Sequence, residues 1–193
     1  MKRIAVFCGA NIGTHPIYKK EIEELGKQLV RNKYELVYGG AKVGLMGAIA
    51  DAVLKEGGKV IGVMPDFMDD KELAHEGLTE LIWVASMHER KTLMADLSDG
   101  FIATSGGFGT FDELFEILTW AQLGLHQKPI GLLNINGLFN PLLQMLDNMV
   151  ENGFLKEHNK NKLLVADNPS ELLQKMKNFQ GDYQPKWINK NQV

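Results

Sequence analysis

Cysteine is the residue that this sequence most clearly lacks: Cys8 is the only one in 193 residues. A single cysteine excludes an internal disulfide, and it is more typical of a small buried residue than of a nucleophile. Long hydrophobic runs are missing too, because no stretch approaches the roughly 20 apolar residues of a membrane-spanning helix. The first residues, MKRIAVFCGA, are too short and strand-like for a signal peptide. We therefore expect a cytoplasmic protein.

An excess of positive charge is also absent, since the formal net charge is −3 and the isoelectric point lies near 6.0. General binding of nucleic acid requires a basic face, so this function is disfavoured. An anionic ligand would need local cations instead. The hydrophobic and charged shares, 45% and 23%, are ordinary for a globular protein. We expect one domain over residues 1–180 and a polar tail over 181–193.

Short apolar runs alternate along the chain with longer helical patterns. The predicted strands lie near residues 3–9, 34–40, 59–65, 79–85, 100–106, 129–134 and 163–167. The predicted helices lie near residues 16–32, 44–56, 87–98, 110–125, 139–152 and 169–179, and 66–78 is the long irregular stretch. Nearly continuous apolar runs are typical of parallel strands that are buried on both faces. The sequence therefore predicts a Rossmann-like, doubly wound α/β fold: a mainly parallel sheet of about seven strands with helices on both faces.

Glycine-rich or polar segments follow four of the predicted strands. The first strand ends at Gly9, the second ends at Gly39 and Gly40, the fourth runs into SMHERK (86–91), and the fifth runs into TSGGFGT (104–110). Ligands of such folds bind beyond the carboxyl ends of the strands, where the winding direction switches. We therefore expect a binding site at this edge, with the three strand-end glycines close to the ligand.

The segment TSGGFGTFDE (104–113) places Gly106, Gly107 and Gly109 between a strand and a helix. Bare backbone lets N–H groups converge on an anion, and the helix dipole adds partial positive charge. A phosphate site is the prediction, and a tight strand-to-helix turn is the simpler alternative. The chain has neither the dinucleotide fingerprint after its first strand nor a G-K-[ST] motif, so NAD-dependent redox chemistry and nucleoside triphosphate hydrolysis are disfavoured.

Thr110 and Glu113 have the spacing of a capping box, which would make Thr110 the N-cap and Glu113 a structural residue. A catalytic role for Glu113 is equally compatible with the sequence. A carboxylate near a helix N-terminus should stay ionised, which suits a base or a stabiliser of a cation. Both interpretations remain open at this point.

A second capping box, formed by Ser86 and Glu89, precedes Arg90 and Lys91. Cations in the opening turns of a helix interact unfavourably with its dipole. An unfavourable placement with no local compensation indicates a functional role. The planar fork of arginine also suits phosphate or a carboxylate partner. His88 has no partner histidine or cysteine at a ligand spacing, so we predict no metal site.

Together these segments resemble the LOG ("lonely guy") family of cytokinin riboside 5′-monophosphate phosphoribohydrolases. The family pattern P-G-G-x-G-T-x-x-E is similar to SGGFGTFDE (105–113), and M-x-x-R-K matches MHERK (87–91). FCGA, YGGAKVGLMG, ELAHEGLTEL and TWAQLGLHQKPIGLLN are also similar to family segments, so the likeness covers most of residues 3–170. Two departures are Ser105, where the family has proline, and Ala10, where a serine is common.

The resemblance implies that Arg90 and Glu113 are catalytic. It implies that the 5′-phosphate is held by Gly106, Gly107, Phe108, Gly109 and Thr110. It further implies that Glu72, Lys91 and Thr119 help to bind substrate, and we add Met87, which could touch a flat base, and Asp112. The implied reaction is hydrolysis of a nucleoside 5′-monophosphate at its N-glycosidic bond by a homodimer without a cofactor.

Two other functions remain to be weighed. A nucleotide-binding or carrier module would use the same pocket without turnover. A pyridoxal-phosphate-dependent lysine decarboxylase would need a Schiff-base lysine and a partner for the pyridinium nitrogen, and only Lys91 is available for such a role.

Overall fold

The computed structural model describes residues 1–71 and 73–181, and it contains one seven-stranded sheet in the order β4-β3-β2-β1-β5-β6-β7. The strands are β1 (Arg3–Phe7), β2 (Glu35–Tyr38), β3 (Val60–Pro65), β4 (Glu80–Val84), β5 (Gly100–Ala103), β6 (Ile130–Leu133) and β7 (Leu163–Ala166). Every neighbouring pair is parallel. The predicted doubly wound α/β fold is therefore confirmed. Residues 182–193, most of the predicted tail, lie outside the described residues.

All six predicted helices are present, with ends within three residues of the prediction. The helices are α1 (Pro16–Arg31), α2 (Gly44–Lys55), α3 (Met87–Leu97), α4 (Phe108–Gln122), α5 (Asn140–Glu151), α6 (Glu157–Lys160) and α7 (Pro169–Asn178), with 3₁₀ turns η1 (Asp66–Lys71) and η2 (Ile135–Gly137). The sequence did not reveal α6 and η2, because such short elements develop no periodic apolar pattern. Within the described parts of the chain, no helix is long and apolar enough to cross a membrane.

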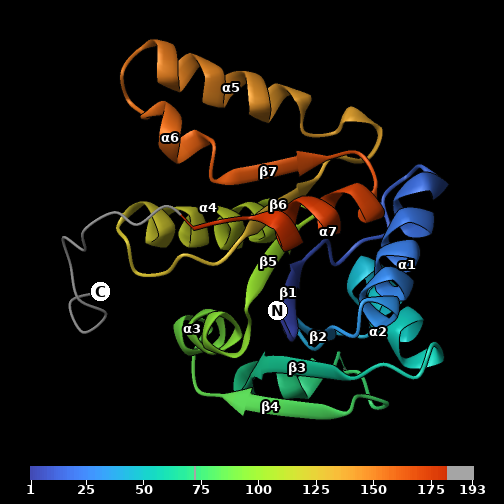
Figure 1. Cartoon of the computed structure of the whole chain (residues 1–193). Helices are drawn as coiled ribbons and strands as arrows, with labels where there is room; N and C mark the ends of the chain where they lie inside the picture. Colours follow the sequence, from blue (N-terminus) through green and yellow to red (C-terminus); the bar gives the residue numbers. More distant parts are fainter. Residues whose placement is uncertain (72, 182–193) are drawn as a thin grey trace.

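Helices cover both faces of the sheet (Figure 1), so the protein has two apolar cores. One core packs α1, α2 and α7 against the sheet, and the other packs α3, α4 and α5. Strand β1 contributes to both, since Ile4 and Val6 enter the first core while Ala5 and Phe7 enter the second. A strand that is buried on both faces has no polar side, which explains the continuous apolar runs in the sequence.

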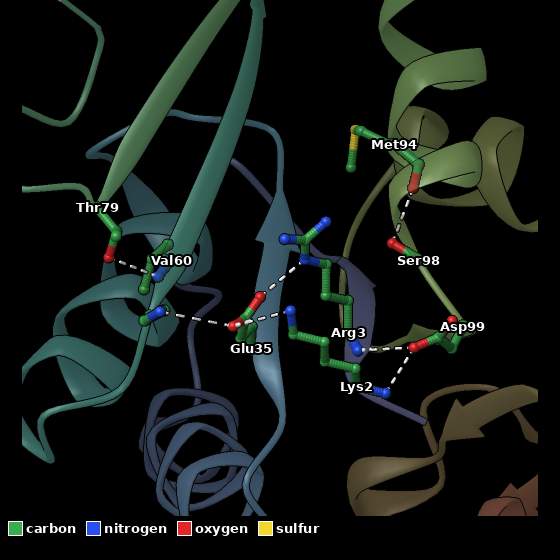
Figure 2. A network of polar contacts seen from close by, with 9 residues as sticks. Lys2, Arg3, Glu35, Val60, Thr79, Met94, Ser98 and Asp99 are labelled. Atoms are coloured by element: carbon green, nitrogen blue, oxygen red, sulfur yellow. Dashed lines mark hydrogen bonds and ion pairs between the residues drawn. The ribbon is translucent and has the colours of Figure 1, made fainter.

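Polar contacts join the amino ends of the strands (Figure 2). Arg3 Nε donates to Glu35 Oε2 at 2.7 Å, and the backbone N–H of Arg3 donates to Asp99 Oδ2 at 3.0 Å. The Val60 N–H donates to Thr79 Oγ1 at 3.0 Å. The hydrogen bond from Arg3 lowers the pKa of Glu35. This end of the sheet is therefore closed by its own side chains, and the carboxyl end carries the site.

Candidate active site

The winding direction of the sheet switches between β1 and β5, which are hydrogen-bonded neighbours. The loops that follow these two strands are joined directly, because the Gly9 N–H donates to the Ser105 carbonyl at 3.0 Å. A cleft of about 700 Å³ opens at this point. Its volume lies within the range of small-molecule sites, and its place is the one expected for a doubly wound fold.

Ten of the predicted site residues line this cleft. They are Gly9, Met87, Arg90, Lys91, Gly106, Gly107, Gly109, Thr110, Asp112 and Glu113. The loops after β1 and β5 and the first turns of α3 and α4 bring them together. The candidate site therefore joins segments that are about 100 residues apart in the chain.

The glycine loop leaves the first turn of α4 uncovered. The helix begins at Phe108 with Gly107 as its N-cap, and no side chain caps it. A Cβ atom at Gly107 or Gly109 would meet nothing within 4 Å, so the backbone there faces open space. Gly106 is different, because a Cβ there would overlap Thr110 Oγ1. The loop can thus present helix N–H donors to an anion at close range.

Of the two interpretations left open for Thr110 and Glu113, the structure excludes the capping box. Because α4 begins at Phe108, Thr110 is its third residue and Glu113 its sixth. Glu113 does not reach back along the helix: its Oε1 accepts from Arg90 Nη1 at 2.7 Å. The helix dipole acts mainly on the first turn, so Arg90, and not the dipole, is the main stabiliser of this carboxylate.

Arg90 and Glu113 form a buried ion pair, with side chains only 12% and 11% exposed. Burial raises the pKa of Glu113, and the charge and hydrogen bond of Arg90 oppose this rise. Asp112 raises the pKa of Glu113 further, and Lys91 lowers it. The pair places an anion and a fixed cation in a poorly hydrated part of the cleft, where charges interact strongly.

Cys8 lies beside this pair, at the end of β1, and is itself buried. Burial raises the pKa of its thiol, and the neighbouring Glu113 carboxylate raises it further. The thiolate is the reactive form of cysteine, so Cys8 is a packing residue.

The start of α3 fixes the backbone that carries Arg90. Ser86 Oγ accepts from the Glu89 N–H at 3.2 Å, and Glu89 Oε2 accepts from the Ala85 N–H at 2.8 Å. The capping role predicted for Ser86 and Glu89 is confirmed, although the return bond goes to Ala85 and not to Ser86. Arg90 Nε also donates to the carbonyl of Val63, within β3, at 3.0 Å.

Lys91 bridges α3 to two carboxylates of α4. Its Nζ lies 3.2 Å from Asp112 Oδ2 and 3.1 Å from Glu116 Oε1. Burial lowers the pKa of Lys91, but the hydrogen bonds and charges of the two carboxylates outweigh it, so the pKa is raised. A Schiff base forms from a neutral amine, and this environment keeps Lys91 charged.

Four predicted site residues lie outside the cleft lining: Gly39, Gly40, Phe108 and Thr119. Gly40 has a φ of +82°, and its carbonyl accepts from the His75 N–H, so it serves the backbone turn after β2. Phe108 is 96% exposed. Thr119 Oγ1 donates to the Phe115 carbonyl at 2.7 Å on an exposed face of α4. Glu72 lies outside the described residues.

The cleft also has an apolar side that sequence reasoning missed. It is built by the loop after β1 and by parts of α1, α2 and the turn before α5, and its apolar side chains are Ile12, Tyr18, Leu45, Met46 and Leu138. These residues carry no charge. Leu45 and Met46 lie in the segment YGGAKVGLMG, which is similar to a family segment, and Ile12 follows Gly9 and Ala10 at a strand end, but Tyr18 and Leu138 had no signal in the sequence. The charged residues all come from α3 and α4, so the two sides of the cleft differ in chemistry.

The fold and this cleft define an α/β protein of the Rossmann-like class, with a candidate anion site beside a buried ion pair. Residues 46–176 match the family described as "Possible lysine decarboxylase". A probable cytokinin riboside 5′-monophosphate phosphoribohydrolase of Oryza sativa subsp. japonica, LOGL2, is 46% identical over 92% of this chain and 73% of its own. The cytokinin riboside 5′-monophosphate phosphoribohydrolase LOG5 of Arabidopsis thaliana is also 46% identical, over 92% and 78%. The chain belongs to the LOG family of phosphoribohydrolases.

Solved structures support the fold. A molybdenum cofactor binding protein from Rippkaea orientalis superposes with a TM-score of 0.69 at 24% identity, covering 91% of this chain and 95% of that one. The molybdenum cofactor carrier protein of Chlamydomonas reinhardtii has a TM-score of 0.70 at 21% identity, covering 91% and 96%. At such identities the likeness extends to the architecture alone.

Proposed function

We propose that the protein hydrolyses a nucleoside 5′-monophosphate, AMP or an N6-substituted cytokinin riboside monophosphate, to a free adenine-type base and ribose 5-phosphate. The observation that carries this proposal is the buried Arg90–Glu113 ion pair beside the uncovered start of α4. The relatives, which are named as cytokinin riboside 5′-monophosphate phosphoribohydrolases, support the same reaction.

The 5′-phosphate is assigned to the loop from Gly106 to Thr110. Gly107 and Gly109 leave room for a ligand against the backbone, and the first N–H groups of α4 supply donors. The apolar side of the cleft, with Ile12, Tyr18 and Met46, then receives the base. Binding energy from the phosphate, which does not react, helps to align the bond that breaks.

Glu113 stabilises the positive charge that develops on the ribose as the bond to the base breaks. This transition state has oxocarbenium character, as in other glycoside hydrolyses. The oxygen of water bonds to C1′, and the bond from C1′ to the base nitrogen breaks. One proton of the water passes to the departing base and neutralises its negative charge. Glu113 also orients the water, and Arg90 holds the Glu113 carboxylate in place.

The alternatives fit this site less well. A carrier needs no buried carboxylate beside the ligand, whereas Glu113 lines the cleft. A pyridoxal-phosphate enzyme needs a lysine that becomes neutral easily, and the two carboxylates next to Lys91 raise its pKa.

The reaction is tested by incubating the protein with AMP, isopentenyladenosine monophosphate and adenosine, and by measuring free base by chromatography. We expect base from at least one nucleotide. Adenosine should be far poorer in kcat as well as in KM, because the phosphate contributes to transition-state alignment. Release of no base from either nucleotide would favour the carrier function. Equal turnover of AMP and adenosine would exclude the role given to the glycine loop.

We also propose that the protein is a homodimer that packs through α4. Phe108 and Phe115 are exposed, lie seven residues apart and so share one face of this helix with Thr119. A dimer would cover this apolar face. It would also place Thr119 beside the partner's cleft, where Thr119 would contact the substrate bound there.

Light scattering should give about 43 kDa, twice the chain mass of 21.6 kDa. Phe115→Glu should reduce the mass to that of a monomer, because the change buries a charge at the interface. Phe154→Glu is the control, since Phe154 is also exposed but lies beyond the end of α5. A monomeric parent protein at micromolar concentration would contradict this proposal.

A further inference from the structure

Gly39 does not line the cleft, yet it packs against a residue that does. A Cβ atom at Gly39 would come closer than 3.0 Å to Arg90 Nη2, and it would lie 3.1 Å from Met46 Sδ. The backbone itself does not require glycine here, because Gly39 is not among the residues with positive φ, whereas its neighbour Gly40 is. The missing side chain at Gly39 is therefore a matter of space, and the space is filled by the guanidinium of Arg90.

The Arg90 guanidinium is fixed on its other sides. Nε donates to the Val63 carbonyl at 3.0 Å, and Nη1 donates to Glu113 at 2.7 Å and lies 3.6 Å from Met87 Sδ. The group is planar, so it cannot shift one nitrogen without moving the others. A methyl group at position 39 would displace the end of the side chain and leave the strand in place. The cost would thus fall on the ion pair and not on the fold.

We propose that Gly39 is a positioning residue: it leaves the space in which the Arg90 guanidinium lies in the orientation that pairs with Glu113. The inference rests on the function proposed for this pair. It gives Gly39 a role through Arg90 and not through contact with the substrate. Gly39 follows the end of β2, so the geometry of the pair depends on β2 and β3 as well as on α3 and α4, which carry its two side chains.

The first test is Gly39→Ala with AMP as substrate. We expect kcat to fall by about 100-fold, as for a misplacement of roughly 1 Å at a reacting group, with a small change in KM. The acid limb of the pH profile should move to higher pH. The charged and titratable groups near Glu113 are Arg90, Lys91, Asp112 and Cys8. Of these, Arg90 makes the direct hydrogen bond that lowers the pKa of Glu113, and this pKa rises when Gly39→Ala breaks the bond.

Gly58→Ala is the matched control. A Cβ atom at Gly58 would lie 2.5 Å from Val30 Cγ2 and 2.7 Å from Val53 Cγ1, so it is equally crowded, but it precedes β3 at the closed end of the sheet. This variant should melt at a lower temperature and keep its kcat. An unchanged kcat in Gly39→Ala, or an equal loss in both variants, would overturn the proposal.

A double-mutant cycle separates positioning from a general structural effect. If Gly39 acts through Arg90, Gly39→Ala should slow the Arg90→Ala enzyme by less than twofold, because the group it positions is gone. Losses that multiply would show an independent role and overturn the proposal. Should Gly39→Ala alone fail to fold, it is combined with Arg90→Ala and Glu113→Gln, which remove both the overlap and the buried, unpaired carboxylate, and this triple variant should fold. Failure of the triple variant to fold would place the clash elsewhere and overturn the proposal.

A crystal structure of Gly39→Ala provides a readout that needs no turnover. The distance between Arg90 Nη1 and Glu113 Oε1 should grow beyond the ion-pair range of roughly 4 Å. An intact pair in this variant would overturn the inference even if the protein hydrolyses nucleotides. A broken pair would support it even if the parent protein hydrolyses none of those tested. The positioning role and the proposed function can therefore fail separately.

Discussion

Glu113→Gln should lower the turnover of AMP by on the order of 10²-fold or more, because an amide cannot stabilise the positive charge of the transition state as a carboxylate does. The melting temperature should fall as well, because Arg90 stays buried without its anion, but two features limit this loss. The amide keeps an oxygen that can accept from Arg90, and the substitution removes no helix cap, since Glu113 makes no capping bond. AMP should still bind, because the glycine loop is untouched.

This expectation is checked by measuring kcat, AMP affinity and melting temperature for Glu113→Gln and for the parent protein. Thr110→Ala is the comparison variant. It lies in the same turn of α4 and next to the proposed phosphate site, so it should weaken phosphate binding but retain more turnover than Glu113→Gln. Normal turnover by Glu113→Gln would mean that the carboxylate takes no part in the chemistry.

Arg90→Ala should reduce both turnover and stability, and the loss of stability should depend on pH. The variant leaves Glu113 buried without its cation, and breaking a buried pair in this way costs about 3–5 kcal/mol. Burial already raises the pKa of Glu113 while Arg90 is present, and removing Arg90 raises it further. A carboxyl group whose folded-state pKa exceeds its unfolded value contributes stability below the unfolded pKa and loses it as pH rises through the folded pKa.

Thermal melting of Arg90→Ala and of the parent between pH 5 and pH 8 tests this reasoning. The difference between the two proteins should be smallest at the acidic end. Adding Glu113→Gln to Arg90→Ala should restore stability at pH 8, because no buried charge remains, but it should not restore turnover. A loss of stability that is the same at every pH, or no recovery in the double variant, would contradict the assignment of a charged, buried pair.

The sequence predicted the seven strands and six of the helices because each is a local apolar pattern long enough to read. It also predicted which strand ends meet, because parallel strands in this fold place their carboxyl ends at one edge of the sheet. The short elements α6 and η2 escaped because about one helical turn shows no period. The apolar side of the cleft escaped because residues such as Ile12 and Leu138 carry no distinctive chemistry.

The ambiguity at Thr110 and Glu113 has a different origin. A capping box is a local motif. Here the Glu113 carboxylate binds instead to the guanidinium of Arg90, which lies on another helix and 23 residues earlier in the chain. Gly39 illustrates the same limit: its position at a strand end indicated the site, but its neighbour is the side chain of Arg90. Contacts of this kind depend on how helices pack on the sheet, and the local sequence does not contain that information.

The burial of Cys8 has a practical consequence for chemical labelling. Cys8 is the only thiol of the chain, is buried, and has a raised pKa, so maleimides and similar reagents should leave it unmodified in the folded protein. A cysteine placed at an exposed position such as Phe154 would then be the single reactive group. One fluorophore or spin label could then be attached to each chain without first removing a native cysteine.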